Sequence, residues 1–585
     1  MTIPTLLQQK LTNALSQVLG ATLPKDFKGL VTPSADLRFG DYQSNAAMML
    51  AKRVKTNPRA LAQQVVDAIG NDDVCSMEIA GPGFINFRIN PGFFAVGVGE
   101  MLGDARLGVP FTESPKSIVI DFSAPNVAKP MHVGHIRSTI IGDSLARVAR
   151  FVGHKVITDN HIGDWGTQFG MILWGWKNIL DMSALEQNPI DELLRVYKDV
   201  NVQCKENPDL LPICKAELVK LQGGDEENLG IWKRCVDVSK SGLQKIYDRL
   251  DIHFDFWLGE SHYNDALAPL VDEMIEKGMA RESEGAICVF SDGSLPAQED
   301  PFLVQEKGEW RANPCIVRKA DGGFLYATTD LATLDFRTKN WDADSIWYVV
   351  GAPQALHFRQ IFDVERRRGV TGDFRHIAFG SILGDDRRPF KTRSGETVSL
   401  QDVLDEAVER AGKVVEEKSP DMPQEEKARV ASIVGIGAVK FAELSQNRMT
   451  DYVFNWDKML ALQGDTAPYL QNSYVRVKSI FRKVEGEAQD WSLPLVLSDD
   501  AEIHLSRLLV RYGEVVPLVL DDCRPNILAS YIFDLARAFH SFYEACPVLK
   551  SAGDVRRSRL ALCELTSRVL KHGLGLMGID VPDRM

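Results

Sequence analysis

Apolar and polar positions follow patterns that change from one region of the chain to the next. Residues 5–19 and 43–69 carry apolar residues at helical spacing. Residues 84–89 alternate between apolar and polar side chains, as a strand does, directly after a Gly-Pro-Gly turn. We therefore expect residues 1–112 to form a small α+β module that ends in a linker at residues 109–115.

A strand–helix–strand pattern follows this linker. Residues 117–123 form a short apolar run that is typical of a buried strand. Residues 135–152 have an apolar face at helical spacing, and residues 155–158 form another strand-like run. This alternation predicts a parallel sheet covered by helices.

The same succession returns later in the chain. We expect a strand at residues 345–350, a helix at 354–368, and a further strand that opens at 377–379. The two halves predict one Rossmann-type, doubly wound sheet with a long insertion at about residues 177–310. No motif can be recognised in that insertion.

Helical patterns dominate the rest of the chain. Residues 400–447 are helical and charged, and the last third, from about residue 455, is predicted to be all-α. The fold class is therefore a multidomain α/β plus all-α protein. The predicted domains are a small α+β domain at 1–112, a Rossmann-type catalytic domain at 113–395, a helical connector at 396–450 and an all-α domain at 451–585.

Composition and charge narrow the function only slightly. Among 585 residues, 67 Lys and Arg face 80 Asp and Glu, and the net charge of −13 argues against nucleic-acid binding through overall charge. A local basic path remains possible. The nine cysteines form no C-x-x-C pair, which argues against a zinc ribbon and a disulfide framework. Because no signal peptide or membrane-length apolar run is seen, we expect a soluble, cytoplasmic protein without membrane contacts.

The strongest chemical signal is NVAKPMHVGH at residues 126–135, between a predicted strand and a predicted helix. Helix N-termini offer unpaired N–H groups and a positive dipole, which hold phosphate. Gly134 permits close approach of a ligand, and Lys129 adds a positive charge. His132 and His135 lie one turn apart and can face the same ligand. The pattern suits a polyphosphate transition state, and its alternatives are an ordinary strand-to-helix connection or a metal site built on H-x-x-H.

Two other segments place polar or basic residues among glycines. Residues 381–395 carry Lys391 and Arg393 and suit either a phosphate clamp or a solvated basic loop. Residues 159–170 (DNHIGDWGTQFG) suit either a pocket wall or a structured turn. The sequence has no P-loop motif and no G-x-S-x-G, and its G-x-G-x-x-G at Gly573 follows a helical stretch. These absences argue against a P-loop nucleotide site and weaken a hydrolase interpretation.

These motifs resemble those of the arginyl-tRNA synthetases, within class I of the aminoacyl-tRNA synthetases. HVGH resembles the HIGH signature of that class. The segments that resemble bacterial arginyl-tRNA synthetases are GDYQSNAA (40–47), FSAPNVAKPMHVGHIRSTIIGD (122–143), DNHIGDWGTQFG (159–170), YVVGAPQALHFRQ (348–360), PFKTRSG (389–395), DLAR (534–537) and MGIDVPDRM (577–585). The resemblance implies a ligase that activates L-arginine with ATP to arginyl-adenylate. It then transfers the arginyl group to the 3′-terminal adenosine of tRNA(Arg), releasing AMP and diphosphate.

The resemblance also implies an ATP site. His132 and His135 match the pair that binds the phosphates and the transition state. The second class signature, usually KMSKS, reads KTRSG here, so Lys391 matches its first lysine while the second is missing. Lys129 stands where a lysine is thought to compensate, and it completes the implied catalytic set. The implied ATP-binding residues are Pro125, Asn126, Val127, Ala128, Lys129, Pro130, Met131, His132, Val133, Gly134, His135, Lys391, Arg393 and Ser394. We expect Mg²⁺ to arrive with ATP and no tightly bound protein metal.

The resemblance assigns six residues to the arginine pocket, namely Asp121, Asn126, His161, Tyr326, Asp330 and Gln354. Chemistry supports the carboxylates independently, because a guanidinium pairs best with them. Asp330 taken alone is also a plausible N-cap for a helix at residues 331–339. Asp121 lies in a predicted buried strand, where a carboxylate needs a cation.

The resemblance assigns tRNA contacts to both ends of the chain. The N-terminal module is implied to bind the tRNA elbow through Phe84 and Asn86, and the C-terminal helical domain to bind the anticodon. The candidates there are Tyr469, Tyr474, Arg476, Lys478 and Tyr531. Aromatic side chains stack on unpaired bases, although each of these tyrosines equally fits a helical core. The resemblance further implies a monomer whose adenylate formation needs bound tRNA.

Three other functions fit parts of the sequence. Small-molecule nucleotidyltransferases also use an H-x-G-H loop, but their chains are short and lack a C-terminal helical domain. A different class I synthetase is disfavoured by the PFKTRSG text and by the lack of Cys/His zinc spacing. A catalytically inactive RNA-binding relative is disfavoured by the intact HVGH, by Lys391 and by the carboxylates.

Overall fold

The structure is a computed structural model. It describes residues 2–24, 27, 29–70, 72–166, 168–384, 387–388, 398–487 and 489–585. The chain divides into two compact units. The terminal unit comprises residues 1–111, 462–575 and 580–585, and the central unit comprises residues 112–461 and 576–579. The finer division into four domains stays a prediction.

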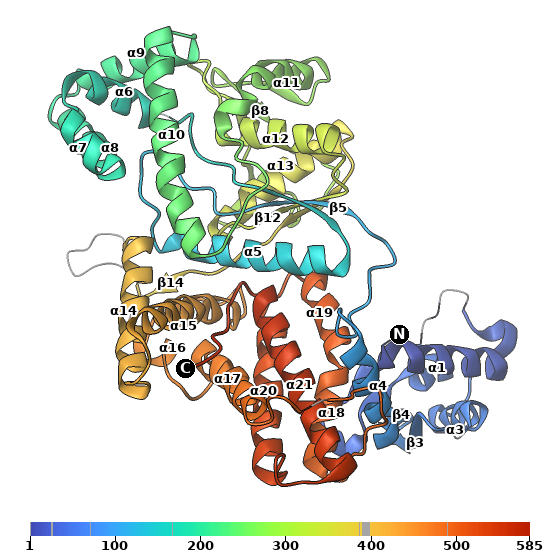
Figure 1. Cartoon of the computed structure of the whole chain (residues 1–585). Helices are drawn as coiled ribbons and strands as arrows, with labels where there is room; N and C mark the ends of the chain where they lie inside the picture. The colour runs from blue at the N-terminus through green and yellow to red at the C-terminus, as the bar shows by residue number, and fades with distance from the viewer. Residues whose placement is uncertain are drawn as a thin grey trace. The chain divides into compact units, whose positions relative to one another are not determined.

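The central unit is built on a four-stranded parallel sheet in the order β13-β12-β5-β6. Its strands are β5 (Ser117–Asp121), β6 (Lys155–Asp159), β12 (Ser345–Tyr348) and β13 (Asp373–His376). The covering helices are α5 (Gly134–Val152), α12 (Tyr326–Asn340) and α13 (Ala355–Arg368). Figure 1 shows α12 and α13 on one side of this sheet and α5 on the other. The predicted doubly wound fold is confirmed.

The predicted strand at residues 377–379 is wrong in position. β13 pairs residue for residue with β12, and this pairing ends with His376 opposite Tyr348. Residues 377–379 therefore lie beyond the paired segment, although their apolar side chains made them look like a strand.

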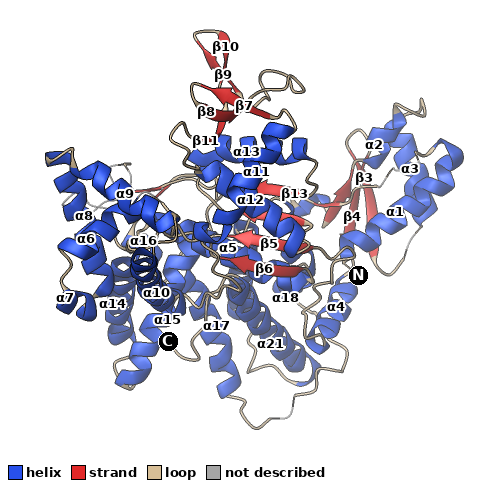
Figure 2. Cartoon of the chain, turned by 90° about the horizontal axis from the view of Figure 1, so that it is seen from above, coloured by secondary structure: helices blue, strands red, loops and turns tan. Residues whose placement is uncertain are grey.

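The insertion between the two halves of the sheet is mostly helical. Its helices are α6 (Gln168–Asn178), α7 (Met182–Gln187), α8 (Pro189–Glu206), α9 (Leu210–Gln222), α10 (Glu226–Arg249) and α11 (Asn264–Glu276). Its strands are β7 (Ala280–Ser283), β8 (Ala286–Val289), β9 (Leu303–Glu306), β10 (Glu309–Ala312) and β11 (Cys315–Arg318). β11, β8 and β7 form one antiparallel sheet, and the separate β9–β10 hairpin projects beyond it in Figure 2.

Two long helices and a small parallel strand pair complete the central unit. The elements are β14 (Ile382–Leu383), α14 (Leu400–Lys418), α15 (Gln424–Leu444), β15 (Tyr452–Val453) and α16 (Trp456–Met459). β14 pairs with β15, so the chain before residue 384 lies beside the chain that follows α15. The helical pattern predicted for residues 400–447 is confirmed, with a break at residues 419–423.

The terminal unit joins the two ends of the chain. Its N-terminal elements are α1 (Ile3–Leu19), β1 (Thr32–Pro33), β2 (Tyr42–Ser44), α2 (Ala46–Ala51), α3 (Pro58–Ile69), β3 (Cys75–Ala80), β4 (Phe84–Ile89) and α4 (Pro91–Gly103). Its C-terminal helices are α17 (Ala467–Arg482), α18 (Asp500–Val510), α19 (Tyr512–Asp521), α20 (Asn526–Ala545) and α21 (Gly553–Leu576). The Tyr42 hydroxyl donates to Glu514 Oε1 at 2.7 Å, and Asp41 pairs with Arg507, so charged contacts connect the two sets.

The predicted single helix at residues 43–69 is partly wrong. The segment begins in β2 and continues as two helices, because the Asn57 side chain accepts hydrogen bonds from the N–H groups of Arg59 and Ala60 and starts α3 anew at Pro58. The predicted strand at residues 84–89 coincides with β4.

Candidate active site

The parallel sheet creates a natural binding edge where its strand order reverses. β5 and β12 are neighbours, although they come from the two separate halves of the sheet. In doubly wound sheets, ligands bind at the carboxyl ends of the strands beside such a switch point. Asp121 ends β5, Asp159 ends β6 and Tyr348 ends β12. The H-x-G-H turn (residues 132–135) follows β5 and leads into α5, so it belongs to this edge.

The two histidines of the turn are held by backbone N–H groups. His132 Nδ1 accepts from Gly134 N at 3.1 Å, and His135 Nδ1 accepts from His132 N at 3.1 Å. The ring centroids are 4.0 Å apart. Burial, with a contribution from His132, lowers the pKa of His135 to about 3, and burial also lowers the pKa of His132. Both rings are therefore neutral at pH 7, with Nε2 left to carry the proton and donate it to a ligand.

The segment after residue 397 returns to the histidine turn. Val133 N donates to Val398 O, and Leu400 N donates to Met131 O, each at 2.9 Å. Val398 is the first described residue after the segment that carries the second signature. Lys391, Arg393 and Ser394 themselves lie outside the described residues. The first described residues after that segment are thus hydrogen-bonded to the turn.

The predicted ATP-binding stretch is only partly exposed. The side chains of five of its residues are buried, so they can offer only backbone groups to a nucleotide; these are Pro125, Val127, Ala128, Met131 and Val133. Lys129 is half-buried, and its Nζ lies 4.4 Å from the centroid of the Tyr197 ring. It lines a cleft of about 690 Å³ together with Ser399, which is paired with His132. The Lys129 charge is therefore close to the turn.

Asn126 lies beside Gly163, in the segment of residues 159–166. The backbone groups on either side of Asn126 hydrogen-bond to Gly163, and its side chain contacts the same residue. Val127 N donates to Gly163 O at 3.0 Å, and Gly163 N donates to Pro125 O at 3.1 Å. A Cβ at position 163 would lie 2.3 Å from Asn126 Oδ1. Residues 159–166 thus lie directly beside Asn126, and glycine at 163 makes room for the Asn126 amide.

Asp121 already has a cation within the protein. Arg337 Nη2 donates to Asp121 Oδ2 at 2.6 Å and to Asp159 Oδ2 at 2.8 Å, with all three side chains buried. Burial raises the pKa of Asp121, and Arg337 opposes the rise. The expectation that this carboxylate needs a cation is met by Arg337 of α12. Its charge therefore gives no independent support to a guanidinium contact, and that assignment stays a prediction.

Asp330 lies inside a helix rather than at its start. α12 begins at Tyr326, so Asp330 is not the N-cap that residues 331–339 suggested. Its Oδ2 lies 2.6 Å from Nε2 of His357, on α13. Tyr326 is 65% exposed and stands one turn before Asp330, and Gln354, exposed, directly precedes α13. His357 is a candidate site residue that sequence reasoning missed, although it stands in the quoted YVVGAPQALHFRQ.

Glu260 is a second residue that the sequence did not reveal. Burial, with nearby Asp164 and Asp330, raises the pKa of Glu260 to about 7 against the opposing effect of His161. Burial raises the pKa of Tyr326, and nearby Glu260 adds to that rise. A cluster of carboxylates beside an exposed tyrosine suits a guanidinium. Glu260 belongs to the insertion and carries no local motif, so it becomes a candidate only through the fold.

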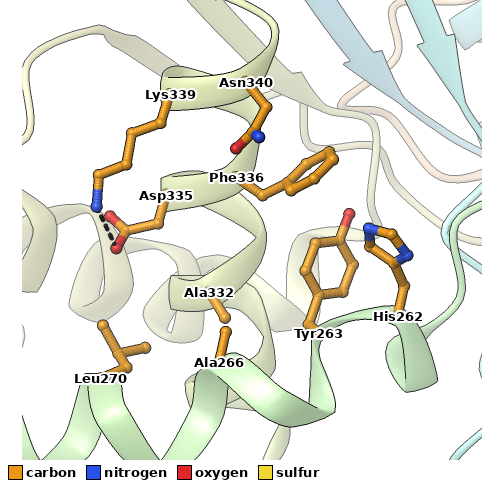
Figure 3. A pocket seen from close by; sticks show the side chains of 9 residues that line it. All are labelled: His262, Tyr263, Ala266, Leu270, Ala332, Asp335, Phe336, Lys339 and Asn340. Atoms are coloured by element: carbon orange, nitrogen blue, oxygen red, sulfur yellow. Dashed lines mark hydrogen bonds and ion pairs between the residues drawn. The ribbon is translucent and has the colours of Figure 1, made fainter.

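His161, another predicted arginine-pocket residue, lies near a separate cleft. His161 Nδ1 is buried without a hydrogen bond in the described part of the chain, and its ring lies 5.6 Å from that of Tyr263. Tyr263 also lines a cleft of about 250 Å³ between α11 and α12 (Figure 3). The six predicted arginine-pocket residues do not line that cleft. It is therefore distinct from the proposed arginine pocket.

The predicted tRNA residues of the terminal unit divide into core and surface. Tyr474 and Tyr531 are 3% and 6% exposed, and the Tyr531 hydroxyl donates to Leu508 O at 2.8 Å. Their rings are not free to stack on a base, so the alternative of a helical core is the correct one for both. Lys478 Nζ lies 5.5 Å from the Tyr474 ring centroid and is half-buried.

Tyr469 and Arg476 lie in a surface cluster that α17 and α20 share. The Tyr469 ring is 5.2 Å from His540 and 5.5 Å from Phe533. Arg476 Nη1 donates to His540 Nδ1 at 2.7 Å, and Tyr543 nearby is 38% exposed. Aromatic rings interleaved with a cation suit unpaired RNA. His540 and Tyr543 were missed, although they stand in the same helix as DLAR, α20.

The two N-terminal tRNA candidates both stand on β4. Phe84 is half-buried, whereas Asn86 is 5% exposed and is paired with Gln43 and Glu78 within the sheet.

In the part of the chain that the structure describes, no helix has the length and apolar character needed to span a bilayer.

Three family models match the chain in succession. The model described as the arginyl tRNA synthetase N terminal domain matches residues 5–89. The model of the class I (R) tRNA synthetase catalytic domain matches residues 98–456, and that of the DALR anticodon binding domain matches residues 470–585.

Full-length relatives and a solved structure agree with these matches. The chain is 44% identical to an arginine–tRNA ligase of Laribacter hongkongensis and 43% identical to one of Cellvibrio japonicus, covering 100% of each chain. The arginyl-tRNA synthetase structure from Plasmodium falciparum superposes with a TM-score of 0.83 at 26% identity, again over 100% of both chains.

Proposed function

The chain belongs to the arginyl-tRNA synthetase family, and from this we propose that it ligates L-arginine to tRNA(Arg) at the expense of ATP. Arginine and ATP form arginyl-adenylate and diphosphate, and the arginyl group then passes to the 3′-terminal adenosine with release of AMP. One observation supports this most: the H-x-G-H turn and the carboxylates of Asp330 and Glu260 belong to the same doubly wound unit. Asn126 pairs with Gly163, and Glu260 N donates to Ile162 O at 3.2 Å in the same segment.

The first step needs no protein base. The carboxylate of arginine attacks the α-phosphorus of ATP, a new P–O bond forms, and the bond to the bridging oxygen of diphosphate breaks. Catalysis therefore rests on positioning and on stabilising phosphate charge. His132 and His135 supply neutral N–H donors, and Lys129 supplies positive charge. We assign Lys391, Arg393 and Ser394 to the same phosphates, with Mg²⁺ entering as part of the substrate MgATP.

Arginine recognition rests on two carboxylates and two amides. Asp330 and Glu260 accept hydrogen bonds from the guanidinium, with Tyr326 beside them. Asn126 and Gln354 suit the substrate's α-amino and carboxylate groups, and His161 borders the pocket. Asp121 contributes by holding Arg337, because its charge is compensated inside the protein. A neutral substrate would leave the two carboxylates unpaired, which gives selectivity for arginine.

Residues from both ends of the chain bind transfer RNA in the terminal unit. We assign Tyr469 and Arg476, with His540 and Tyr543, to the anticodon, because their rings and cation lie at the surface. Phe84 is the better N-terminal candidate for the tRNA elbow, since Asn86 is buried in the sheet. We further propose a cytoplasmic monomer.

One assay tests the proposal against its rivals. Arginine-dependent exchange of labelled diphosphate into ATP should occur with tRNA(Arg) and fall sharply without it. Exchange with another amino acid would point to a different synthetase. Exchange without any amino acid would point to a nucleotidyltransferase, and no exchange at all would point to an inactive RNA-binding relative.

A further inference from the structure

Arg137 is a fully buried arginine on the helix that carries His135. It stands two residues after His135 in α5, so the two side chains project from nearly opposite sides of the helix. Its side chain is 1% exposed. Nη1 donates to Gly380 O at 2.8 Å and to Thr450 O at 3.0 Å. These carbonyls stand just before β14 and β15, so one guanidinium holds the start of both strands.

The charge of Arg137 is compensated from α15. Glu443 Oε2 lies 3.1 Å from Arg137 Nε, and its own side chain is 1% exposed. The Tyr452 hydroxyl of β15 donates to the other carboxylate oxygen. Burial raises the pKa of Glu443 to about 7, and Arg137 opposes that rise. A buried pair of this kind adds little net stability compared with apolar side chains, so its presence calls for another explanation.

Packing around Gly380 leaves little freedom at the same place. A Cβ on Gly380 would lie 2.7 Å from Asp451 Oδ1 and 2.8 Å from the carbonyl carbon of Thr450. Ser381 N donates to Asp451 Oδ1 at 2.5 Å, and Gly380 N donates to Arg448 O at 2.8 Å. The chain that enters β14 is therefore fixed on both sides.

We propose that Arg137, Glu443 and Tyr452 are positioning residues that fix β14 against the helix bearing His135 and so set the geometry in which ATP reacts. The inference rests on the proposed function. It adds a link from α15 to the phosphate site, through residues that touch no substrate. Misplacement of reacting groups by about 1 Å costs roughly 100-fold in rate, so a small shift of α5 against β14 is enough to be measured.

Two variants test the link in the full-length protein. Glu443→Gln removes the charge, and Tyr452→Phe removes a single hydroxyl. With arginine and tRNA(Arg) saturating, we expect kcat/KM for ATP in diphosphate exchange to fall roughly 10- to 100-fold in Glu443→Gln and about tenfold in Tyr452→Phe. KM for arginine should stay within about twofold of wild type, because Asp330 and Glu260 stand on other elements.

The matched control is Glu416→Gln. Glu416 Oε1 lies 2.9 Å from Lys427 Nζ, so this change removes another carboxylate that pairs with α15. It should leave both constants unchanged. A pair that serves only stability would lower the melting temperature of the variants without selectively changing kcat/KM for ATP, and that result would overturn the inference.

Tyr452→Phe decides the question if Glu443→Gln does not fold, because it removes one oxygen and keeps the ring. Unchanged constants in a folded Tyr452→Phe protein, with an active wild type, would contradict the inference alone. A wild type that shows no arginine-dependent exchange would instead contradict the proposed function.

Discussion

Replacing Gly163 by alanine separates the function of Asn126 from the stability of the fold. The new Cβ would lie 2.3 Å from Asn126 Oδ1, whereas Cβ contacts below 3.0 Å essentially do not occur, so the amide oxygen must move by at least 0.7 Å. Gly163 does not have a left-handed backbone, so alanine adds no backbone strain. The atom that moves is the end of an exposed side chain, and we expect the melting temperature to stay close to wild type.

The functional cost follows from the contact that Asn126 would lose. A hydrogen bond to a charged group contributes about 1.5–3 kcal/mol, and each 1.4 kcal/mol is a factor of ten. We expect kcat/KM for arginine in tRNA-dependent diphosphate exchange to fall roughly 10- to 150-fold, with KM for ATP little changed.

Gly166→Ala is the matched control from the same segment. The nearest atom to its new Cβ is Tyr326 Oη at 3.8 Å, an ordinary contact, so activity should be retained. A Gly163→Ala protein that keeps kcat/KM for arginine within twofold of wild type would refute the role of Asn126 in arginine binding.

Three other variants probe the remaining parts of the site. His135→Ala should lower the diphosphate exchange rate by roughly 10²–10³, the usual effect of losing one transition-state donor, and an unchanged rate would remove His135 from catalysis. The pKa of Glu260 is raised to about 7, so KM for arginine should fall as the pH rises through 7 and this carboxyl ionises. Glu260→Gln should abolish that pH dependence, and a variant with the wild-type pH profile would contradict the role of Glu260 in arginine binding. Tyr469→Ala should raise KM for tRNA(Arg) in aminoacylation by roughly 5- to 150-fold through lost stacking. Tyr531→Ala should chiefly lower the melting temperature, because Tyr531 is buried, and the reverse pattern would disprove the assignment of Tyr469 to the tRNA-binding surface.

The sequence predicted the fold wherever a local pattern determines an element. α5 and the β5–β6 pair were expected from their apolar spacing, and the parallel sheet followed from strand–helix alternation. The error at residues 43–69 arose because a helical pattern does not show that Asn57 caps a new helix. The error at residues 377–379 arose because pairing with β12, rather than apolarity, decides where β13 ends.

Candidate site residues could be predicted where their chemistry lies within one continuous segment of the sequence. The histidine turn was predicted from motifs that resemble a known family, and Asp330 was predicted as what that resemblance implies. The partner of Asp121 could not be found, because Arg337 stands on another element and reaches it through the fold. Glu260 has no motif, and its pKa is raised by burial and by Asp164 and Asp330, which come from distant segments. Long-range contacts of this kind are absent from a single sequence.

Direct transfer of labelled arginine to tRNA(Arg) tests the central claim most directly. With ATP and intact tRNA, we predict a product in which arginine is joined as an ester to the 3′-terminal adenosine, with one AMP and one diphosphate released for each arginine attached. Transfer RNA that lacks its terminal adenosine should accept no arginine. Failure to charge intact tRNA(Arg), or equal labelling of tRNA without that adenosine, would contradict the account.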